Sequence, residues 1–235
     1  MKEIGMLFCG AMVAALRDGR KTATRRLLKP QPVEHGPDDF EWRSAKLKSI
    51  GHAAGYVHIC KECMERIAAK CAAPEPPFRI YVKETFSTDF RNHYPHDPIW
   101  YRADDDRHID IDVHDGVQSI YSPESKQWVP FKWRPSIFMR REQARLWLAC
   151  TAVRVERLQD ITTEGAKEEG LFFNGSSWSY LEKGRFPYSE SCWSAPVACY
   201  RHLWESINGK GSWDANPFVT VFTFKVDTAP RQAQY

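Results

Sequence analysis

Hydrophobic residues recur at helical spacing in two stretches, one near each end of the chain. After Gly10, the residues Met12, Val13 and Leu16 fall on one face of a helix, and Gly19 stands where a C-terminal cap belongs. The second stretch has apolar residues three and four apart, at Val197, Tyr200, Leu203, Trp204 and Ile207. The pattern therefore predicts one helix after residue 10 and another around residue 200.

Other stretches are rich in β-branched and aromatic residues, or alternate between apolar and polar residues, as strands do. They are residues 6–8, 78–86, 99–104, 146–161 and 217–226. A short helix is predicted directly after residue 161, with Thr162 or Thr163 as its N-cap and Gly170 as its end.

The order of these elements indicates the fold class. Strands separated by short helices, without a regular βαβ repeat, favour an α+β fold built on a mixed, mostly antiparallel β-barrel. We expect a single domain over residues 1–235 that carries two insertions. The first, at residues 33–77, is polar and expected to be irregular; the second, at 172–194, is rich in Gly, Ser and aromatic residues, and residues 227–235 are expected to form a flexible tail.

Composition narrows the class of protein. Apolar residues make up 43% of the chain and aromatic residues 13%, which is enough for a hydrophobic core. The 33 Lys and Arg exceed the 30 Asp and Glu only slightly, so any binding site for a polyanion has to be local. Seven cysteines, no signal peptide and no apolar run of about 20 residues indicate a soluble, cytoplasmic protein without a membrane partner. We expect a monomer.

Several reaction classes lack their sequence signatures. The chain has no glycine-rich loop of the P-loop or dinucleotide-binding kind and no HExxH pairing of histidines. The serines of "GSSWS" and "SESCWS" lack the strand-to-helix setting of a nucleophile elbow. Chemistry that depends on these motifs is therefore not expected.

One segment has the residue types of a zinc site. The sequence "HICKEC" contains His58, Cys60 and Cys63, and Cys71 follows eight residues later. Four such ligands suffice for structural zinc. The alternative is a set of ordinary thiols in a helical insertion, which the lack of a second, matching cysteine pair favours. A zinc ion here would stabilise the insertion and would not form the active site.

The segment "DGRKTATRR", residues 18–26, offers a different kind of chemistry. Lys21 and Thr24 are three residues apart, close enough in a turn for the amine to reach the hydroxyl. A lysine can take the proton of a threonine hydroxyl only if burial or a neighbouring cation lowers its pKa, and arginines stand nearby. A carboxylic acid that protonates a leaving amine would complete the set, and Glu84 and Glu169 are the candidates.

These residues also have simpler interpretations. The basic segment can be an anion-binding turn, which residue types alone favour. Glu84 can be a solvent-facing residue of its strand. The pattern alone does not decide between these interpretations and the chemical one.

The same segment resembles a known family. Gly19, Lys21, Thr24 and Arg26 match the G-x-K-x-x-T-x-R signature of the ASCH domain, a PUA-like β-barrel family. The segments "IYVKETF", "YRAD", "WRPSIFM", "VRVERLQDITTEGAKEEG" and "WESINGKGSWDANPFVTVFTFKV" are similar to those of phage and prophage members. The resemblance leaves only the two insertions uncovered, and it implies a PUA-like barrel with short helices.

The resemblance also implies an activity. A small bacterial member of the family hydrolyses N4-acetylcytidine to cytidine and acetate, with a lysine as proton acceptor, a threonine as nucleophile and a glutamate as proton donor. By position these roles fall on Lys21, Thr24 and Glu169. The expected substrate is a modified nucleoside or nucleic-acid base, and no metal or other cofactor is needed.

Further roles are expected around this set. Arg26 would hold an oxyanion or a phosphate, and Trp133 and Arg134 would stack on or flank the base. An aromatic residue such as Trp133 is found in a core about as often as on a stacking platform, so both interpretations of it stay open. Glu84 would bind the base or replace Glu169 as the acid. The chain departs from related phage proteins at Phe138, where many have histidine, and it is far longer than the amidohydrolase. Both departures bear on which substrate the site accepts.

Two other functions remain open at this point. ASCH domains are also proposed as RNA-binding modules, and a non-catalytic module for RNA or DNA would use Lys21 and Arg26 as anion contacts. A ribonuclease would use Lys21 and its neighbours on phosphodiesters. Salt dependence of binding, or cleavage of RNA, would separate these functions from amide hydrolysis.

Overall fold

The computed structural model describes residues 1–50, 55–89, 99–104, 111–123, 125–180 and 194–227. Expectations that concern residues 181–193 of the second insertion and the tail from residue 228 lie outside these described residues.

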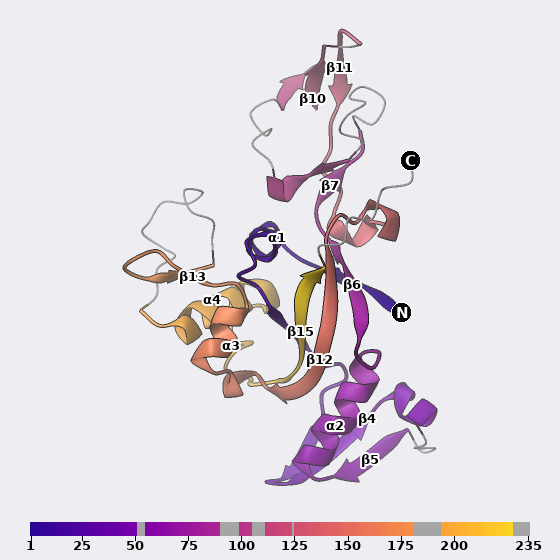
Figure 1. Cartoon of the computed structure of the whole chain (residues 1–235), viewed down its shortest axis with the longest axis vertical. Helices are drawn as coiled ribbons and strands as arrows, with labels where there is room; N and C mark the ends of the chain where they lie inside the picture. Colours follow the sequence, from indigo (N-terminus) through magenta and orange to yellow (C-terminus); the bar gives the residue numbers. More distant parts are fainter. Residues whose placement is uncertain (51–54, 90–98, 105–110, 124, 181–193, 228–235) are drawn as a thin grey trace.

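A five-stranded sheet forms the centre of the protein (Figure 1). Its strands, in spatial order, are β1 (Glu3–Leu7), β6 (Phe78–Lys83), β12 (Trp147–Arg157), β15 (Phe218–Asp227) and β2 (Ala23–Leu27). Strands β1 and β6 pair in parallel, and the other neighbours pair antiparallel. Strand β6 was predicted from its β-branched and aromatic residues, and every second one of its residues is buried.

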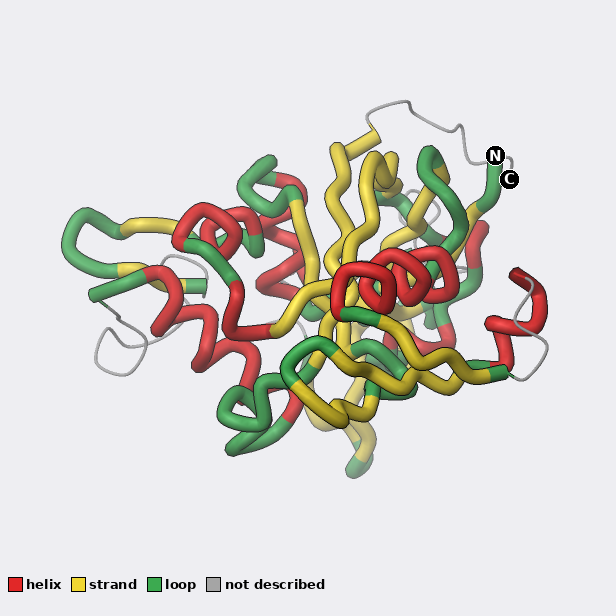
Figure 2. The backbone as a smooth tube through the Cα atoms, turned by 90° about the horizontal axis from the view of Figure 1, so that it is seen from below, coloured by secondary structure: helices red, strands yellow, loops and turns green. Residues whose placement is uncertain are grey.

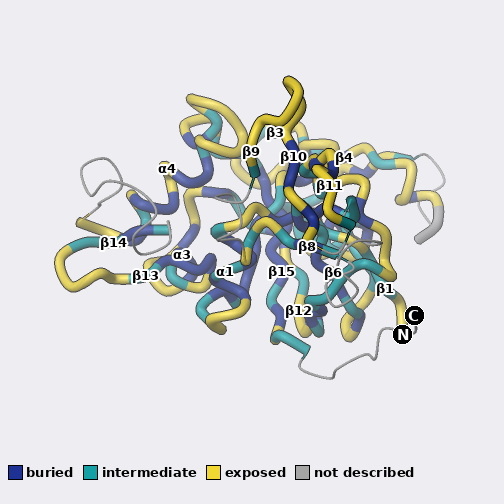
Figure 3. Tube along the Cα trace, turned by 90° about the horizontal axis from the view of Figure 1, so that it is seen from above, coloured by how far each residue is buried: buried dark blue, intermediate teal, exposed yellow. Residues whose placement is uncertain are grey.

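Three helices pack beside this sheet and supply much of the main core. They are α1 (Gly10–Arg17), α3 (Thr163–Glu168) and α4 (Pro196–Asn208), and Figure 1 shows all three on the same side of β12 and β15. The N-cap prediction for α3 is confirmed, because the Gly165 N–H donates to Thr162 Oγ1 at 3.0 Å. Figure 3 shows buried positions on the faces of these elements that meet.

The described residues of the first insertion form regular secondary structure, so the prediction of an irregular segment is wrong. It contains β3 (Val33–Gly36), β4 (Asp39–Arg43), β5 (Tyr56–Ile59) and α2 (Lys61–Ala72), with a 3-10 turn at Ala45–Ile50. The three strands form an antiparallel sheet, and Figure 2 shows α2 beside it. Alternation in β4 buries Phe40 and Trp42 in a second core cluster, but five alternating residues are a weak signal in a polar stretch.

The remaining strands form small, separate pairs and sheets. They are β7 (Phe86–Ser87), β8 (Trp100–Tyr101), β9 (Asp112–His114), β10 (Val117–Ser122), β11 (Gln127–Pro130), β13 (Phe172–Phe173) and β14 (Trp178–Ser179). Further 3-10 turns lie at Arg102–Asp104, Ser136–Phe138, Arg141–Gln143 and Leu158–Asp160. The strand predicted at 99–104 is therefore shorter than expected, because its second half forms a 3-10 turn.

The predicted fold class is confirmed in outline: the protein is mixed α+β, with mostly antiparallel strands. The central sheet ends in β1 on one side and β2 on the other. A side chain connects these two edges, because the Arg26 guanidinium of β2 donates to the carbonyl of Leu7 in β1. Among the described residues, no helix is long and apolar enough to cross a membrane.

Candidate functional site

Lys21 and Glu169 form a buried ion pair. Lys21 follows the end of α1, where Gly19 turns the chain at a φ of +69°, a conformation that glycine adopts at little cost. The backbone of Lys21 pairs with that of Glu169 as an isolated bridge beside α3. Lys21 Nζ lies 2.6 Å from Glu169 Oε2 and donates to the Glu169 carbonyl oxygen at 2.9 Å. Both side chains are at most 2% exposed.

The second oxygen of the Glu169 carboxylate is held by Arg25. The Arg25 backbone N–H donates to Glu169 Oε1 at 2.8 Å, and its guanidinium Nη1 lies 3.2 Å from the same atom. Arg25 also donates to Glu156 Oε1 at 2.8 Å and to the Gly165 carbonyl at 3.1 Å. The guanidinium charge is therefore shared between two carboxylates, and Glu169 contacts positive charge at both oxygens.

Burial changes the proton affinities in this cluster. Desolvation lowers the pKa of Lys21, although the neighbouring Glu169 carboxylate opposes that shift. Tyr200 lies on α4, and burial together with the charge of Glu169 raises its pKa well above the usual value. Tyr200 thus keeps its phenolic proton, whereas Lys21 releases its proton more readily than a lysine in water.

Thr24 follows Lys21 by three residues on the same segment of chain. It is the second residue of β2, is only 1% exposed, and pairs across the sheet with Phe222 of β15. Strand pairing therefore fixes its backbone, three residues after Lys21. The sequence prediction grouped Lys21, Thr24 and Glu169, and the structure buries all three around the junction of α1, β2 and α3.

A small cavity adjoins Glu169 between β2 and α4. Its volume is about 40 Å³, and it is lined by Met12, Arg25, Arg26, Leu27, Glu169, Tyr200, Leu203, Trp204, Ile207 and Asn208. Such a volume holds about three water molecules, at roughly 10–15 Å³ each. Lys21 and Thr24 are not among the described residues that line it. Glu169 is thus the member of the group that connects the buried pair to the cavity.

Arg26 contributes an unused hydrogen-bond donor to the cavity wall. Its guanidinium donates through Nη2 to the Leu7 carbonyl and lies 5.1 Å from the centre of the Phe8 ring. Its Nε is buried and has no hydrogen-bond partner among the described residues. Burial lowers the pKa of this arginine. An unsatisfied buried N–H donor is costly, and it favours an acceptor that enters from the cavity.

Glu84, the alternative carboxylate, lies in a separate ion-pair network. Both of its oxygens accept from Arg145, at 2.9 and 2.8 Å, and Arg145 also contacts Asp104, which pairs with Arg17. Glu84 is only 1% exposed, so its interpretation as a solvent-facing residue is wrong. The structure does not bring Glu84 to Lys21, since its carboxylate is engaged by Arg145.

Trp133 and Arg134 lie in another part of the protein. Arg134 forms an ion pair with Asp89 at 2.8 Å, and its backbone bridges to Phe86. The ring of Trp133 packs edge-on against Phe131 at 5.0 Å, in the core of the small sheet of β9, β10 and β11. Figure 1 shows this sheet at the top of the view, above the part of the protein that contains α3. The structure does not bring either residue to the cavity beside Glu169.

The four residues of the alternative zinc site do not gather at one point. Cys60 is the N-cap of α2, where its sulfur accepts from the Cys63 N–H at 3.4 Å, and Cys71 is buried in the core between α2 and the insertion's sheet. His58 instead approaches Glu41 on the neighbouring strand. The cysteines therefore match the alternative interpretation, thiols on a helix of the insertion.

Sequence reasoning missed two residues of the cavity region. Arg25 was considered only as a neighbouring cation. Its hydrogen bonds to Glu169 depend on strand pairing that the sequence does not reveal. Tyr200 was assigned to the core face of α4; that assignment is correct, but it gave no sign that the phenol also lies near Glu169.

Comparison of the chain with known proteins finds no matching family model, no matching curated protein and no matching solved structure. Functional inference therefore rests on the geometry of the residues described above.

Proposed function

We propose that the protein is an amidohydrolase that removes the acyl group from an N4-acylated cytosine, in a nucleoside or a nucleic-acid base. The observation that supports this proposal best is the 2.6 Å contact between Lys21 Nζ and Glu169 Oε2 in a nearly solvent-free setting; Thr24, three residues after Lys21, is also buried. Amide hydrolysis needs a base for the nucleophile and an acid for the leaving nitrogen. A lysine and a carboxyl group that share one proton can supply both.

The position of that proton determines what the pair can do. When it resides on Lys21, the pair is an ammonium and a carboxylate; when it moves to Glu169, the pair is a neutral amine and a carboxylic acid. Burial favours the neutral form, because it penalises both charges. Arg25 favours the charged form, but Glu156 shares its charge. The neutral form is the one that is competent for catalysis.

The proposed reaction has two stages. In the first, the Lys21 amine takes the Thr24 hydroxyl proton while the oxygen attacks the acyl carbon, and Glu169 protonates N4 as cytosine leaves. Lys21 then returns its proton to Glu169, which restores the amine and the carboxylic acid. In the second stage the Lys21 amine takes a proton from water while the water oxygen attacks the acyl carbon of the threonine ester, and Lys21 passes that proton to the Thr24 oxygen as its C–O bond to the acyl carbon breaks and the carboxylic acid is released.

Arg26 is suited to stabilise the tetrahedral intermediate. Its buried Nε has no acceptor among the described residues, and a fixed guanidinium stabilises an oxyanion best where water is scarce. The cavity of about 40 Å³ is much smaller than the roughly 300 Å³ of an ordinary ligand pocket. The proposal therefore requires side chains of the last turn of α4, such as Ile207, to move when the base enters.

The PUA-like barrel is part of this proposal. In its support, the central sheet is mostly antiparallel, short helices pack beside it, and Arg26 connects its two edge strands. A non-catalytic RNA- or DNA-binding module is less well supported. Lys21 is fully buried and paired with Glu169, so its ammonium group is not available to a polymer phosphate in this conformation. The same burial argues against a ribonuclease.

The decisive experiment is an assay of N4-acetylcytidine hydrolysis, with cytidine release as the readout. We expect Lys21→Met and Thr24→Ala to lower kcat by at least about 100-fold, as for a positioned base and nucleophile. Thr220→Ala is the matched control, because Thr220 is also a buried threonine of the central sheet, on β15. Circular dichroism would verify that each variant folds.

Two results would contradict the proposal in different ways. An inactive wild-type protein that binds RNA with a steep salt dependence would favour the nucleic-acid-binding module. An active Thr24→Ala variant would exclude the acyl-threonine step and leave direct attack by water.

A further inference from the structure

The outer face of the insertion's small sheet carries a cluster of polar and aromatic side chains. Strand β4 buries Phe40 and Trp42 toward α2, so its alternate residues Asp39, Glu41 and Arg43 lie on the opposite face. Cross-strand pairing puts His58 of β5 directly opposite Glu41. A histidine and a carboxylate are therefore neighbours because of the register of this sheet.

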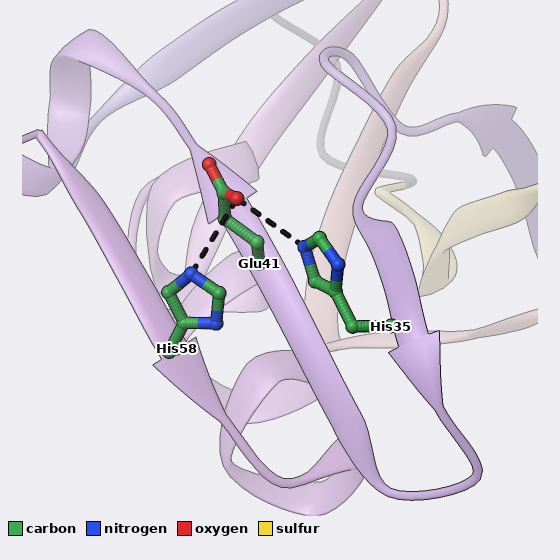
Figure 4. Close-up of side chains that lie close together, drawn as sticks. All are labelled: His35, Glu41 and His58. Atoms are coloured by element: carbon green, nitrogen blue, oxygen red, sulfur yellow. Dashed lines mark hydrogen bonds and ion pairs between the residues drawn. The ribbon is translucent and has the colours of Figure 1, made fainter.

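A β-bulge adds a second histidine to the same cluster. The pairing of β3 with β4 shifts register between Glu34 and Gly36, and His35 is the extra residue. Bulges redirect side chains, and here the His35 ring lies over β4, with its centre 5.3 Å from that of His58 (Figure 4).

The three side chains converge on one point. His35 Nε2 lies 3.3 Å and His58 Nε2 lies 3.4 Å from the same atom, Glu41 Oε2, as Figure 4 shows. All three ligand atoms lie within 4.8 Å of one another. Ligands about 2.1 Å from a tetrahedral zinc ion are separated by about 3.4 Å. The distances from Glu41 Oε2 to the two imidazole nitrogens already have this length. A small rotation of the rings would shorten the remaining distance, the one between the two nitrogens.

The surroundings orient these ligands. His58 Nδ1 lies 3.6 Å from Asp39 Oδ1, and a carboxylate on that side would hold the proton on Nδ1 when Nε2 binds a metal ion. Arg43 Nε donates to Oε1 of Glu41 and thereby leaves Oε2 to the two imidazoles. The histidines are 42% and 50% exposed at their side chains, so an ion can reach them from solvent.

We propose that His35, Glu41 and His58 bind a divalent first-row transition-metal ion. Two imidazole nitrogens and one carboxylate oxygen suit Zn²⁺, Co²⁺ or Ni²⁺ better than Ca²⁺ or Mg²⁺, which prefer oxygen ligands. Water would complete the coordination on the exposed side. The ion would tie β3, β4 and β5 together, and it lies outside the proposed amidohydrolase site.

The test uses the untagged, full-length protein and Zn²⁺ in isothermal titration calorimetry. We expect one Zn²⁺ per chain, with affinity lowered by about 100-fold or more in His35→Ala, His58→Ala and Glu41→Gln, because even partners outside the ligand set cost about 10- to 100-fold. The matched control is His114→Ala, since His114 is also an exposed strand histidine beside a carboxylate, that of Asp115. It should bind Zn²⁺ like the wild type.

A second measurement separates this site from the cysteines. Bound Co²⁺ shows visible absorption that depends on its ligands, and thiolate ligands add intense charge-transfer bands that imidazole and carboxylate do not. We expect no such bands, and unchanged Zn²⁺ affinity in a Cys60→Ser and Cys63→Ser double variant. Wild-type affinity in His35→Ala and His58→Ala, loss of binding only in the cysteine variant, or no binding of Zn²⁺ to the wild type would each overturn the proposal.

Discussion

Glu169 and Glu84 are buried to almost the same degree, at 3% and 1% exposure, yet their partners differ in kind. Glu84 has both oxygens on the guanidinium of Arg145. Glu169 has one oxygen on the amine of Lys21 and the other on Arg25. Both arrangements satisfy a buried carboxylate, and Glu169 in addition lines a small cavity.

The difference shows that burial alone does not identify a chemically useful carboxylate. An arginine keeps its proton in proteins, so the pair of Glu84 and Arg145 has no proton to pass between its members. Burial lowers the pKa of Lys21, so this lysine releases its proton more readily than a lysine in water. The identity of the partner and access to a cavity distinguish a candidate catalytic pair from a structural one.

The largest expected contrast concerns catalysis. Glu169→Gln keeps the shape of the side chain but cannot act as an acid, and we expect it to lower kcat for N4-acetylcytidine by between about 100- and 10,000-fold. Glu84→Gln should keep kcat within a factor of about 3, because distant, independent sites rarely couple by more than about 0.5 kcal/mol. Steady-state kinetics on both folded variants measures this contrast. Equal losses in the two would make Glu84 part of the active site.

The second contrast concerns stability. Arg145→Ala leaves the Glu84 carboxylate buried without its bidentate partner, and loss of one member of a buried pair costs about 3–5 kcal/mol of unfolding free energy. Arg154→Ala is the matched control, since the Arg154 side chain is 49% exposed in its ion pair with Glu156. We expect a change within about 0.5 kcal/mol there. Urea denaturation would measure both, and similar losses would contradict the structural role given to Arg145.

Local signals in the sequence predicted much of what surrounds Glu169. The spacing of Met12, Val13 and Leu16 identified α1, and the Thr162 cap identified α3. The resemblance to the ASCH signature then placed Lys21 and Glu169 in one site, and they do meet. Short-range capping and periodicity are visible in a sequence because the residues involved are neighbours along the chain.

Long-range partners were not predictable in the same way. Arg145 lies 61 residues from Glu84, and no local pattern connects them. The sheet of the first insertion has strands of four or five residues, too short for a clear alternation, and the bulge at His35 breaks it further. Trp133 was assigned to the substrate from its residue type, whereas its neighbours in space place it in a small core of its own.

A smaller effect would test how tightly the chain is packed around Lys21. A Cβ atom added to Gly170 would lie 2.7 Å from Ala15 Cβ and 3.1 Å from Lys21 Cβ, at a φ of +101°. Gly116 also has a positive φ, +78°, but nothing lies within 4 Å of an added Cβ. We expect Gly170→Ala to cost about 2 kcal/mol more than Gly116→Ala, because overpacking adds to the backbone strain that both share. Thermal unfolding of both variants tests this, and equal losses would mean that backbone strain alone accounts for the effect.

The smallest effect is a change of the free energy of unfolding with pH. Of the two buried pairs, we expect it for Lys21 with Glu169 and not for Arg145 with Glu84. Burial lowers the folded-state pKa of Lys21 below its ordinary 10.5, so the unfolded chain binds more protons between these two values. Stability contributed by Lys21 is therefore greatest near pH 10.5 and is lost as the pH falls through the folded-state pKa. The slope is at most about 1.4 kcal/mol per pH unit.

The difference in unfolding free energy between wild type and Lys21→Met, measured by urea denaturation from pH 7 to 9.5, isolates this contribution. We expect the difference to shift in favour of the wild type as the pH rises. Tyr200, whose raised pKa acts in the opposite direction at high pH, is present in both proteins and cancels. The difference between wild type and Arg145→Met should stay constant, because arginine does not titrate in this range. If the difference between wild type and Lys21→Met does not change with pH, Glu169 stabilises the ammonium form of Lys21 as fully as water does. Glu169 and Glu84 would then both be paired with a cation that does not titrate in this range.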